Sequence, residues 1–167
     1  TVKVINHELH TRYEENGKAV NFYTNADKLE KHLLEISPQD KKEIKKLCDA
    51  IRSSNMEMPL AKPMDMMTAG DGIRFAMGNI GKLMKLSRYN KATMGEFAGW
   101  FKEPLLQRAF KAALPGDYLA SVLIMTLAGM HQGDNGYPLG GSRALAKRME
   151  KRFTDLGGKI YYKSKAD

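Results

Sequence analysis

A glycine-rich turn that opens a helix in the last quarter of the chain constrains the fold most. Pro138, Gly140 and Gly141 are followed by apolar residues three or four positions apart, and this spacing predicts a helix through Leu145, Met149, Phe153 and Leu156. Gly157 and Gly158 supply the left-handed cap that a helix end favours, and residues 159–164 have the composition of a strand. A turn, helix and strand in this order usually belong to a larger sheet.

A β-hairpin is predicted near the other end of the sequence. Apolar and polar residues alternate from Ile5 to Tyr13, which is the two-residue period of a half-exposed strand. Asn16 and Gly17 tolerate the positive φ angles of a tight turn, so residues 20–23 are expected to return antiparallel to the first strand.

Helix start signals divide most of the remaining sequence. Asn25 or Thr24 is expected to cap one helix, and Ser37 followed by Pro38 to start the next. Residues 93–96 have the form of a capping box, and Pro104 opens a further helix. These helices, with one predicted over residues 72–88, carry broad apolar faces that are expected to pack on one another and on the sheet.

Composition places the chain among ordinary globular proteins. Its 167 residues suffice for one domain with a real core, and 43% are hydrophobic and 28% charged. The net charge of +8 permits an anionic partner but does not select one. Cys48 is the only cysteine, which excludes an intrachain disulfide and favours a reducing, cytoplasmic setting. The longest apolar run, residues 119–130, falls short of the roughly 20 residues that cross a bilayer, so a buried helix is predicted there.

Two groups of motifs carry a resemblance to a known family. The first group is Pro138-Leu139-Gly140-Gly141, Ala144-Leu145-Ala146 and Gly157-Gly158-Lys159-Ile160; the second comprises residues 17–23, Leu29-Glu30 and residues 36–40. In this order the chain resembles the substrate domain of phytoene-desaturase-like FAD-dependent oxidoreductases, which belong to the flavin amine oxidase superfamily. The similarity spans most of residues 19–160.

This resemblance implies an α+β fold, an antiparallel β-sheet with a cluster of α-helices, in a two-domain flavoprotein. Residues 1–136 would form the substrate-binding domain and residues 137–167 a segment returning toward the FAD domain. The family's dinucleotide-binding Gly-x-Gly-x-x-Gly is missing, because Gly70-Asp71-Gly72 and Gly78 lack the required following glycines. The parent protein is therefore expected to be an oxidoreductase of the desaturase, isomerase or saturase type, and this chain alone to be inactive and free of FAD.

The same resemblance implies the functional residues. Tyr137, Pro138, Gly140 and Gly141 would contact the flavin. The substrate would be apolar, with polyenes as one candidate class, and would be lined by Met64, Met66, Met67, Phe75, Trp100 and, more weakly, His131. The methionine-rich stretch that supplies three of these, and that also holds Met56 and Met58, can equally fill gaps in a core. Ser142 or a neighbour could instead serve only as a helix cap. No catalytic acid or base is assigned.

Other functions stay open at this point. Lys82, Lys85, Arg88 and Lys91 beside apolar methionines suit a stand-alone module that binds lipid or an anionic membrane surface, peripherally from the cytoplasm. The lysine-rich back of the helix from Lys41 to Arg52 could contact nucleic acid, but a solvated face is favoured because no aromatic residues interleave. The histidines lack ligand spacing for a metal, and Cys48 lies on an apolar stripe, where a buried structural role is expected.

Overall fold

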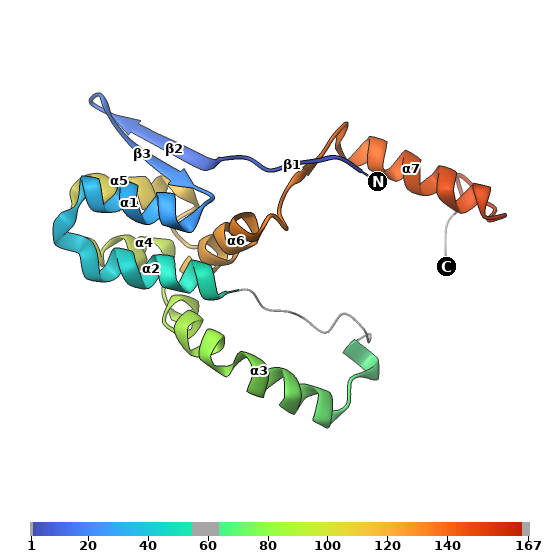
Figure 1. The fold of residues 1–167 in the computed structure, drawn as a ribbon, viewed down its shortest axis with the longest axis horizontal. Helices are drawn as coiled ribbons and strands as arrows, with labels where there is room; N and C mark the ends of the chain where they lie inside the picture. Colours follow the sequence, from blue (N-terminus) through green and yellow to red (C-terminus); the bar gives the residue numbers. More distant parts are fainter. Residues whose placement is uncertain (1, 55–63, 165–167) are drawn as a thin grey trace. The chain divides into compact units, whose positions relative to one another are not determined.

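A computed structural model describes residues 2–54 and 64–164, and these form a mixed α+β structure (Figure 1). The chain divides into two compact units. The helical unit is His7–Asn135, and the end unit combines Thr1–Asn6 with Gly136–Asp167. Each unit is described by itself.

The helical unit contains a β-hairpin, six α-helices and three short 3-10 helices among its described residues. The strands are β2 (Leu9–Glu15) and β3 (Lys18–Tyr23), and the α-helices are α1 (Ala26–Ile36), α2 (Lys41–Ser53), α3 (Ala69–Ser87), α4 (Met94–Ala98), α5 (Pro104–Ala113) and α6 (Ala120–Gln132). The 3-10 helices are η1 (Pro38–Asp40), η2 (Met64–Met66) and η3 (Tyr89–Lys91). In Figure 1 the hairpin lies beside α1 and α5, and α2 runs along α1.

The predicted hairpin is confirmed. Asn16 and Gly17 adopt φ angles of 50° and 74°, as a two-residue turn requires. Val20 and Phe22 alternate with outward residues and are completely buried. The first strand starts at Leu9 rather than at Ile5, because Val4 and Ile5 pair elsewhere, and an irregularity at His10 shifts the register.

Local capping explains where several helices begin. Asn25 accepts hydrogen bonds from the backbone N–H groups of Asp27 and Lys28, and Thr93 forms the predicted capping box with Glu96. The helix start at Ser37 differs from the prediction. The Ser37 hydroxyl donates a hydrogen bond to the buried Asp40 carboxylate at 2.7 Å and makes no capping bond to a backbone N–H group. Pro38 therefore opens a 3-10 turn, and α2 follows directly.

One core holds the helical unit together. It contains the inward side chains of the hairpin and of α1, α2, α4, α5 and α6, together with Leu86 and Tyr89. Phe110 lies at its centre, with ring centroids 4.6 Å from Phe101, 5.0 Å from Phe97 and 5.2 Å from Phe22. The predicted burial of Cys48 and of the apolar helix α6 is confirmed, although Val122 and Met125 on α6 stay exposed.

Helix α3 departs from the expectation that every apolar helix face is packed. It begins at Ala69, three residues earlier than predicted, because Thr68 and Asp71 form a capping box. Only Asn79 and Leu86 are buried along it. The stripe that suggested a core-facing helix is exposed instead, because α3 packs on α2 and η3 through a different side.

The end unit consists of a two-residue strand pair and one helix. β1 (Val4–Ile5) pairs antiparallel with β4 (Tyr137–Pro138), and α7 (Gly141–Asp155) follows. The predicted cap is confirmed: Gly157 has φ +89°, and the N–H of Gly158 donates to the carbonyl of Phe153 at 2.9 Å. The strand predicted over residues 159–164 is wrong, since these residues form no strand. A strand needs a partner for its backbone groups, and no described strand supplies one there.

Candidate functional site

The turn between β4 and α7 contains the residues that the family resemblance implies for the flavin side. Ile5 pairs with Tyr137 and Val4 with Pro138. The N–H of Leu139 then donates to the carbonyl of Lys3 at 2.8 Å. These backbone contacts fix the direction in which the chain enters the double glycine.

Both glycines of the turn are required by geometry. Gly140 and Gly141 have φ angles of +89° and +73°, which L side chains rarely adopt. A Cβ at Gly141 would lie 2.8 Å from Tyr137 Oη, and one at Gly140 would lie 2.9 Å from Ala144 Cβ. The side chains of Tyr137 and Ala144 thus occupy the space that a Cβ at either glycine would need.

The N-terminus of α7 lacks the usual side-chain cap. Gly140 occupies the cap position and supplies no side-chain acceptor, so the cap is a residue near Ser142 and not Ser142 itself. The first turn also carries no acidic residue. Backbone N–H groups without an intrahelical acceptor and the positive end of the helix dipole favour an anionic group at a helix N-terminus. The turn therefore fits a ligand that approaches through phosphate or a hydrogen-bond-accepting ring edge.

Apolar and aromatic side chains are exposed around this turn, beside the exposed Ser142 and Arg143. Tyr137 and Leu139 are 53% and 46% exposed. Beyond them, Met149, Phe153 and Leu156 on α7 are also exposed. A groove of about 660 Å³ runs over this stripe and is lined by Val2, Leu145, Arg148, Met149, Arg152, Phe153 and Leu156. The contribution of Val2 has no sequence signal, because it depends on the pairing of the two chain ends.

The methionine candidates lie around the start of α3. Met66 and Met67 are 65% and 37% exposed, and Met64 begins η2. Phe75 is half-buried on α3. The other two methionines of this stretch, Met56 and Met58, lie outside the described residues.

Trp100 has a different environment from the methionines. Its ring lies 5.3 Å from Phe97 and 5.7 Å from Tyr89, measured between centroids. The Arg88 guanidinium stacks 4.1 Å above it, at a distance typical of a cation–π contact. Burial raises the pKa of the neighbouring Tyr89 hydroxyl to about 12, with Arg88 opposing. These contacts give Trp100 a packing role in the helical unit.

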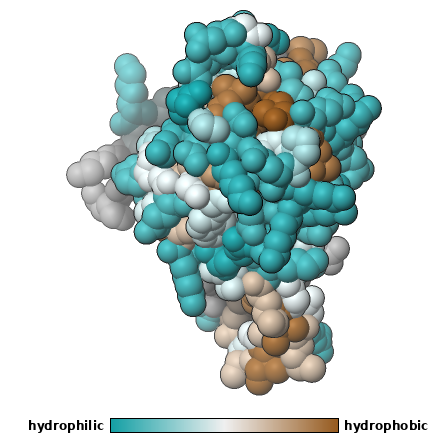
Figure 2. Space-filling view, turned by 90° about the vertical axis from the view of Figure 1, so that its left-hand side faces the viewer, coloured by the Kyte–Doolittle hydropathy of each residue, from teal (hydrophilic) through white to brown (hydrophobic). Residues whose placement is uncertain are grey.

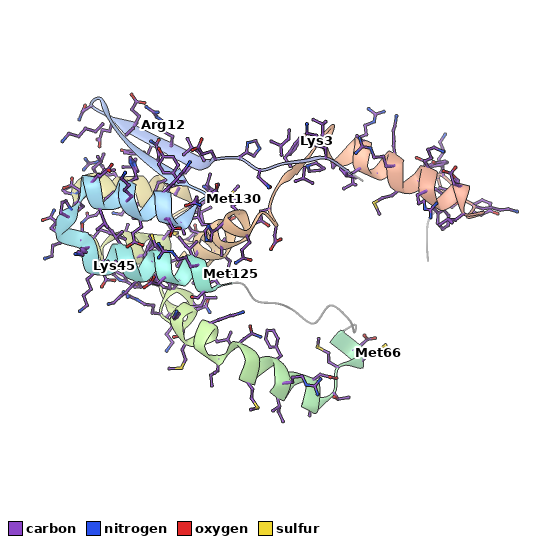
Figure 3. The ribbon with its side chains drawn as sticks, in the orientation of Figure 1. Lys3, Arg12, Lys45, Met66, Met125 and Met130 are labelled. Atoms are coloured by element: carbon purple, nitrogen blue, oxygen red, sulfur yellow. The ribbon has the colours of Figure 1, made fainter. Side chains whose placement is uncertain are left out.

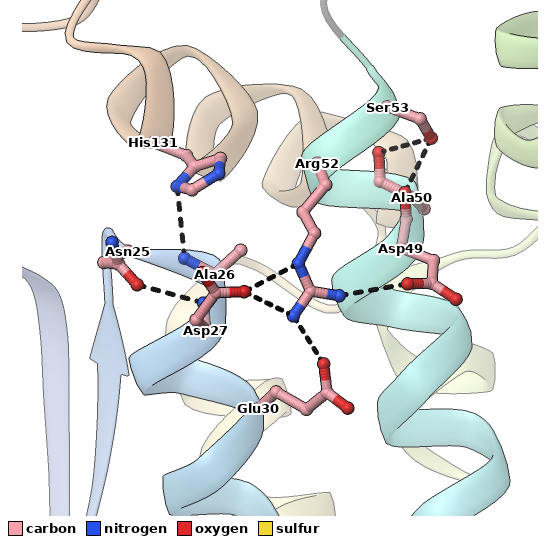
Figure 4. A network of polar contacts seen from close by, with 9 residues as sticks. All are labelled: Asn25, Ala26, Asp27, Glu30, Asp49, Ala50, Arg52, Ser53 and His131. Atoms are coloured by element: carbon pink, nitrogen blue, oxygen red, sulfur yellow. Dashed lines mark hydrogen bonds and ion pairs between the residues drawn. The ribbon is translucent and has the colours of Figure 1, made fainter.

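His131 lies in the last turn of α6. Its Nδ1 accepts a hydrogen bond from the N–H of Ala26, the first residue of α1, at 3.3 Å (Figure 4). The imidazole therefore ties the C-terminus of α6 to the N-terminus of α1. Its surroundings are unrelated to those of Trp100.

Arg52 lies in the same region and binds three carboxylates. Its guanidinium contacts Glu30, Asp27 and Asp49 at 2.5, 2.7 and 3.0 Å (Figure 4). Burial alone would lower the pKa of Arg52, but hydrogen bonds to Glu30 and Asp27 outweigh it and raise the pKa above its ordinary value. This pairing neutralises one end of the basic α2 face and makes it a poorer surface for nucleic-acid phosphates.

Nucleophilic and metal chemistry find little basis in the described part of the chain. Burial raises the pKa of the Cys48 thiol to about 12, which disfavours the reactive thiolate. No group of three or more His, Cys, Asp or Glu side chains in residues 2–54 and 64–164 could hold a metal ion.

Comparisons with protein-family models, with curated proteins and with solved structures found no match to this chain. Of the helices described, none is both long and apolar enough to cross a membrane.

Proposed function

We propose that this chain is the substrate-binding part of an FAD-dependent oxidoreductase that resembles the phytoene desaturases. In this proposal the helical unit belongs to the substrate domain, and the end unit leads into a flavin domain. The substrate is an apolar molecule, with a polyene as the first candidate class.

The observation that carries the proposal is the double-glycine turn. A Cβ at Gly140 or Gly141 would collide with Ala144 or with Tyr137, and the helix that starts there has no side-chain cap. Backbone N–H groups at a helix N-terminus suit the pyrophosphate or ring edge of a dinucleotide. The residues present therefore fit the group that the sequence resemblance implies.

The exposed faces of the end unit support the same proposal. Gly141 is the only buried residue among the described residues of this unit. Large apolar side chains on α7 and after it face solvent, among them Met149, Phe153, Leu156, Ile160, Tyr161 and Tyr162. A layer with so little burial requires further structure to cover it, and a flavin domain would provide that cover.

Roles follow for the individual residues. Tyr137, Pro138, Gly140 and Gly141 hold the cofactor side of the site, and the exposed Met66 and Met67 offer flexible apolar surface to the substrate. The remaining lining candidates are Met64, Phe75, Trp100 and His131. When bound, FAD supplies the hydride-accepting chemistry, and the protein's residues bind, orient and exclude water.

The test compares two glycines in the full reading frame that contains this sequence. We expect the frame to encode a strand, a Gly-x-Gly-x-x-Gly turn and a helix, and its purified product to carry flavin. Gly141→Ala should lower the flavin content, because the new Cβ meets Tyr137 Oη. Gly157→Ala is the matched control, since Gly157 also has a positive φ of +89° but nothing within 4 Å of a Cβ.

Two results would contradict the proposal. The first is a full product that contains no dinucleotide-binding turn and no flavin. The second is equal flavin content in the two glycine variants. The 167-residue chain alone, mixed with FAD, should give no stoichiometric yellow complex.

A further inference from the structure

Helix α3 carries a continuous exposed apolar stripe. Ile73, Met77, Ile80 and Met84 follow one another at intervals of four, three and four residues, so they share one face. Their exposed fractions are 61%, 75%, 62% and 70%. Isolated exposed apolar residues are ordinary, but four large ones in a row on one helix mark a contact surface.

The figures show where this stripe lies. Figure 1 places α3 at the lower edge of the helical unit, and Figure 2 shows apolar residues gathered at that lower end. Met66, which is 65% exposed, lies just before α3 (Figure 3). The apolar surface thus extends beyond the helix to the turn in front of it.

Positive charge flanks the stripe. Arg74 directly follows Ile73 and Lys85 directly follows Met84, and both are exposed. Asp71 is the one acidic residue of α3, and its carboxylate accepts from the N–H and hydroxyl of Thr68 in the capping box. The apolar stripe of α3 therefore has basic residues next to it and no acidic residue within it.

The composition of α3 makes its helical state depend on contacts. Four of its residues, Gly70, Gly72, Gly78 and Gly81, are the least favourable helix formers after proline. Only two residues of the helix are buried in the helical unit. An apolar medium along the exposed stripe would stabilise a helix that is otherwise weakly supported.

We propose that this face of α3 binds the surface of an anionic lipid bilayer. The helix lies in the plane of the interface, with Ile73, Met77, Ile80 and Met84 among the upper acyl chains and Arg74 and Lys85 at the phosphate groups. This inference does not depend on the flavin proposal.

The experiment measures binding of the purified chain to sedimented vesicles. Vesicles of phosphatidylcholine alone are compared with vesicles that also contain phosphatidylserine, at low and high salt. We expect binding to the anionic vesicles at low salt and a strong reduction at high salt, because the basic residues contribute through screened electrostatics. Met77→Asp combined with Met84→Asp should weaken binding at least about tenfold, because it places two carboxylates on the inserted face.

A matched control separates this face from exposed methionines in general. Met149→Asp changes a methionine on α7 that is 66% exposed, close to the 75% of Met77. It should leave vesicle binding unchanged. Circular dichroism of each variant checks folding, which substitutions of exposed side chains should preserve.

Three outcomes would overturn the proposal. Wild-type protein could fail to bind anionic vesicles, or the α3 variant could bind as well as wild type. Alternatively, Met77→Asp could abolish a dimer seen by sedimentation velocity while vesicle binding is absent, which would assign the face to a second copy of the chain. Lys85→Glu provides an independent check, and it should lower binding at low salt only.

Discussion

The helical unit and the end unit contain similar apolar residues but differ in what those residues contact. In the helical unit the rings of Phe22, Phe97, Phe101 and Phe110 pack together and are almost completely buried. In the end unit Phe153 is 49% exposed and Met149 is 66% exposed. The periodicity of α7 and its caps determine its secondary structure, whereas burial depends on a partner element.

This difference indicates which unit can be stable by itself. Apolar burial is the main favourable term in folding, and it offsets the loss of conformational entropy. The helical unit has that burial, and α7 has local support instead, such as the Lys151–Asp155 ion pair at 2.8 Å and the Gly157 cap. Local support of this kind gives only marginal helices in water.

The largest test of the comparison replaces one phenylalanine in each unit. Phe110→Ala removes a fully buried ring and should lower the free energy of unfolding by about 3–5 kcal/mol. Phe153→Ala removes a half-exposed ring and should cost less than about 0.5 kcal/mol. Urea unfolding followed by circular dichroism sees both units, and Trp100 fluorescence reports on the helical unit. Equal costs for the two variants would break the distinction.

A second test concerns buried polar side chains, which among the described residues lie in the helical unit and there join distant elements. Asp40 is 3% exposed, and its carboxylate accepts from the N–H groups of Lys102 and Glu103 at 2.8 and 3.0 Å. Asp40→Ala leaves these donors unpaired and should cost about 2–3 kcal/mol. Asp40→Asn, which keeps one acceptor oxygen, should fall between the alanine variant and wild type.

The matched control for Asp40 is an aspartate of the end unit. Asp155 pairs with Lys151 across one turn of α7, and both side chains are at least half exposed. Asp155→Ala should therefore change stability by less than about 0.5 kcal/mol. A cost at Asp155 as large as that at Asp40 would show that α7 contributes to the core stability, contrary to the comparison.

Much of the secondary structure could be predicted from the sequence because its signals are local. The Asn16–Gly17 turn, the Asn25 cap, the Thr93 capping box and the Gly157 cap each depend on a few adjacent residues. What could not be predicted is which apolar face finds a partner. Ile73 and Met77 on α3 have the spacing of core residues and are nevertheless exposed, because periodicity defines a face but not its contact.

The residues of the candidate site also fall into those with a local sequence signal and those without one. Pro138, Gly140 and Gly141 can be recognised from the sequence, because glycines before a helix indicate backbone angles that other residues rarely adopt. In the structure Gly140 and Gly141 have positive φ angles, and a Cβ at either would make close contacts. Trp100 and His131 are lining candidates only through the family resemblance. Their roles in packing on Arg88 and in binding the N–H of Ala26 come from residues far away in the sequence. Contacts of that kind leave no local pattern.

The smallest expected effect concerns pH and sharpens the comparison, since all four histidines lie in the helical unit. His32 Nε2 accepts a hydrogen bond from the N–H of Asn21 at 2.9 Å, and burial lowers the pKa of His32, with Glu35 opposing. The unfolded chain therefore binds a proton at His32 more readily than the folded chain does. The contribution of His32 to the free energy of unfolding is present above the unfolded pKa of about 6.5 and falls as the pH drops below it. His32→Gln keeps an acceptor but does not titrate, so its urea midpoint should depend less on pH between about 7 and 5.

Part of the pH dependence should remain in this variant, because burial also lowers the pKa of His10. If the urea midpoint of the glutamine variant depends on pH as strongly as that of wild type, His32 is not the source of the pH dependence. A change in the helicity of α7 over this pH range would contradict the assignment of the pH response to the helical unit.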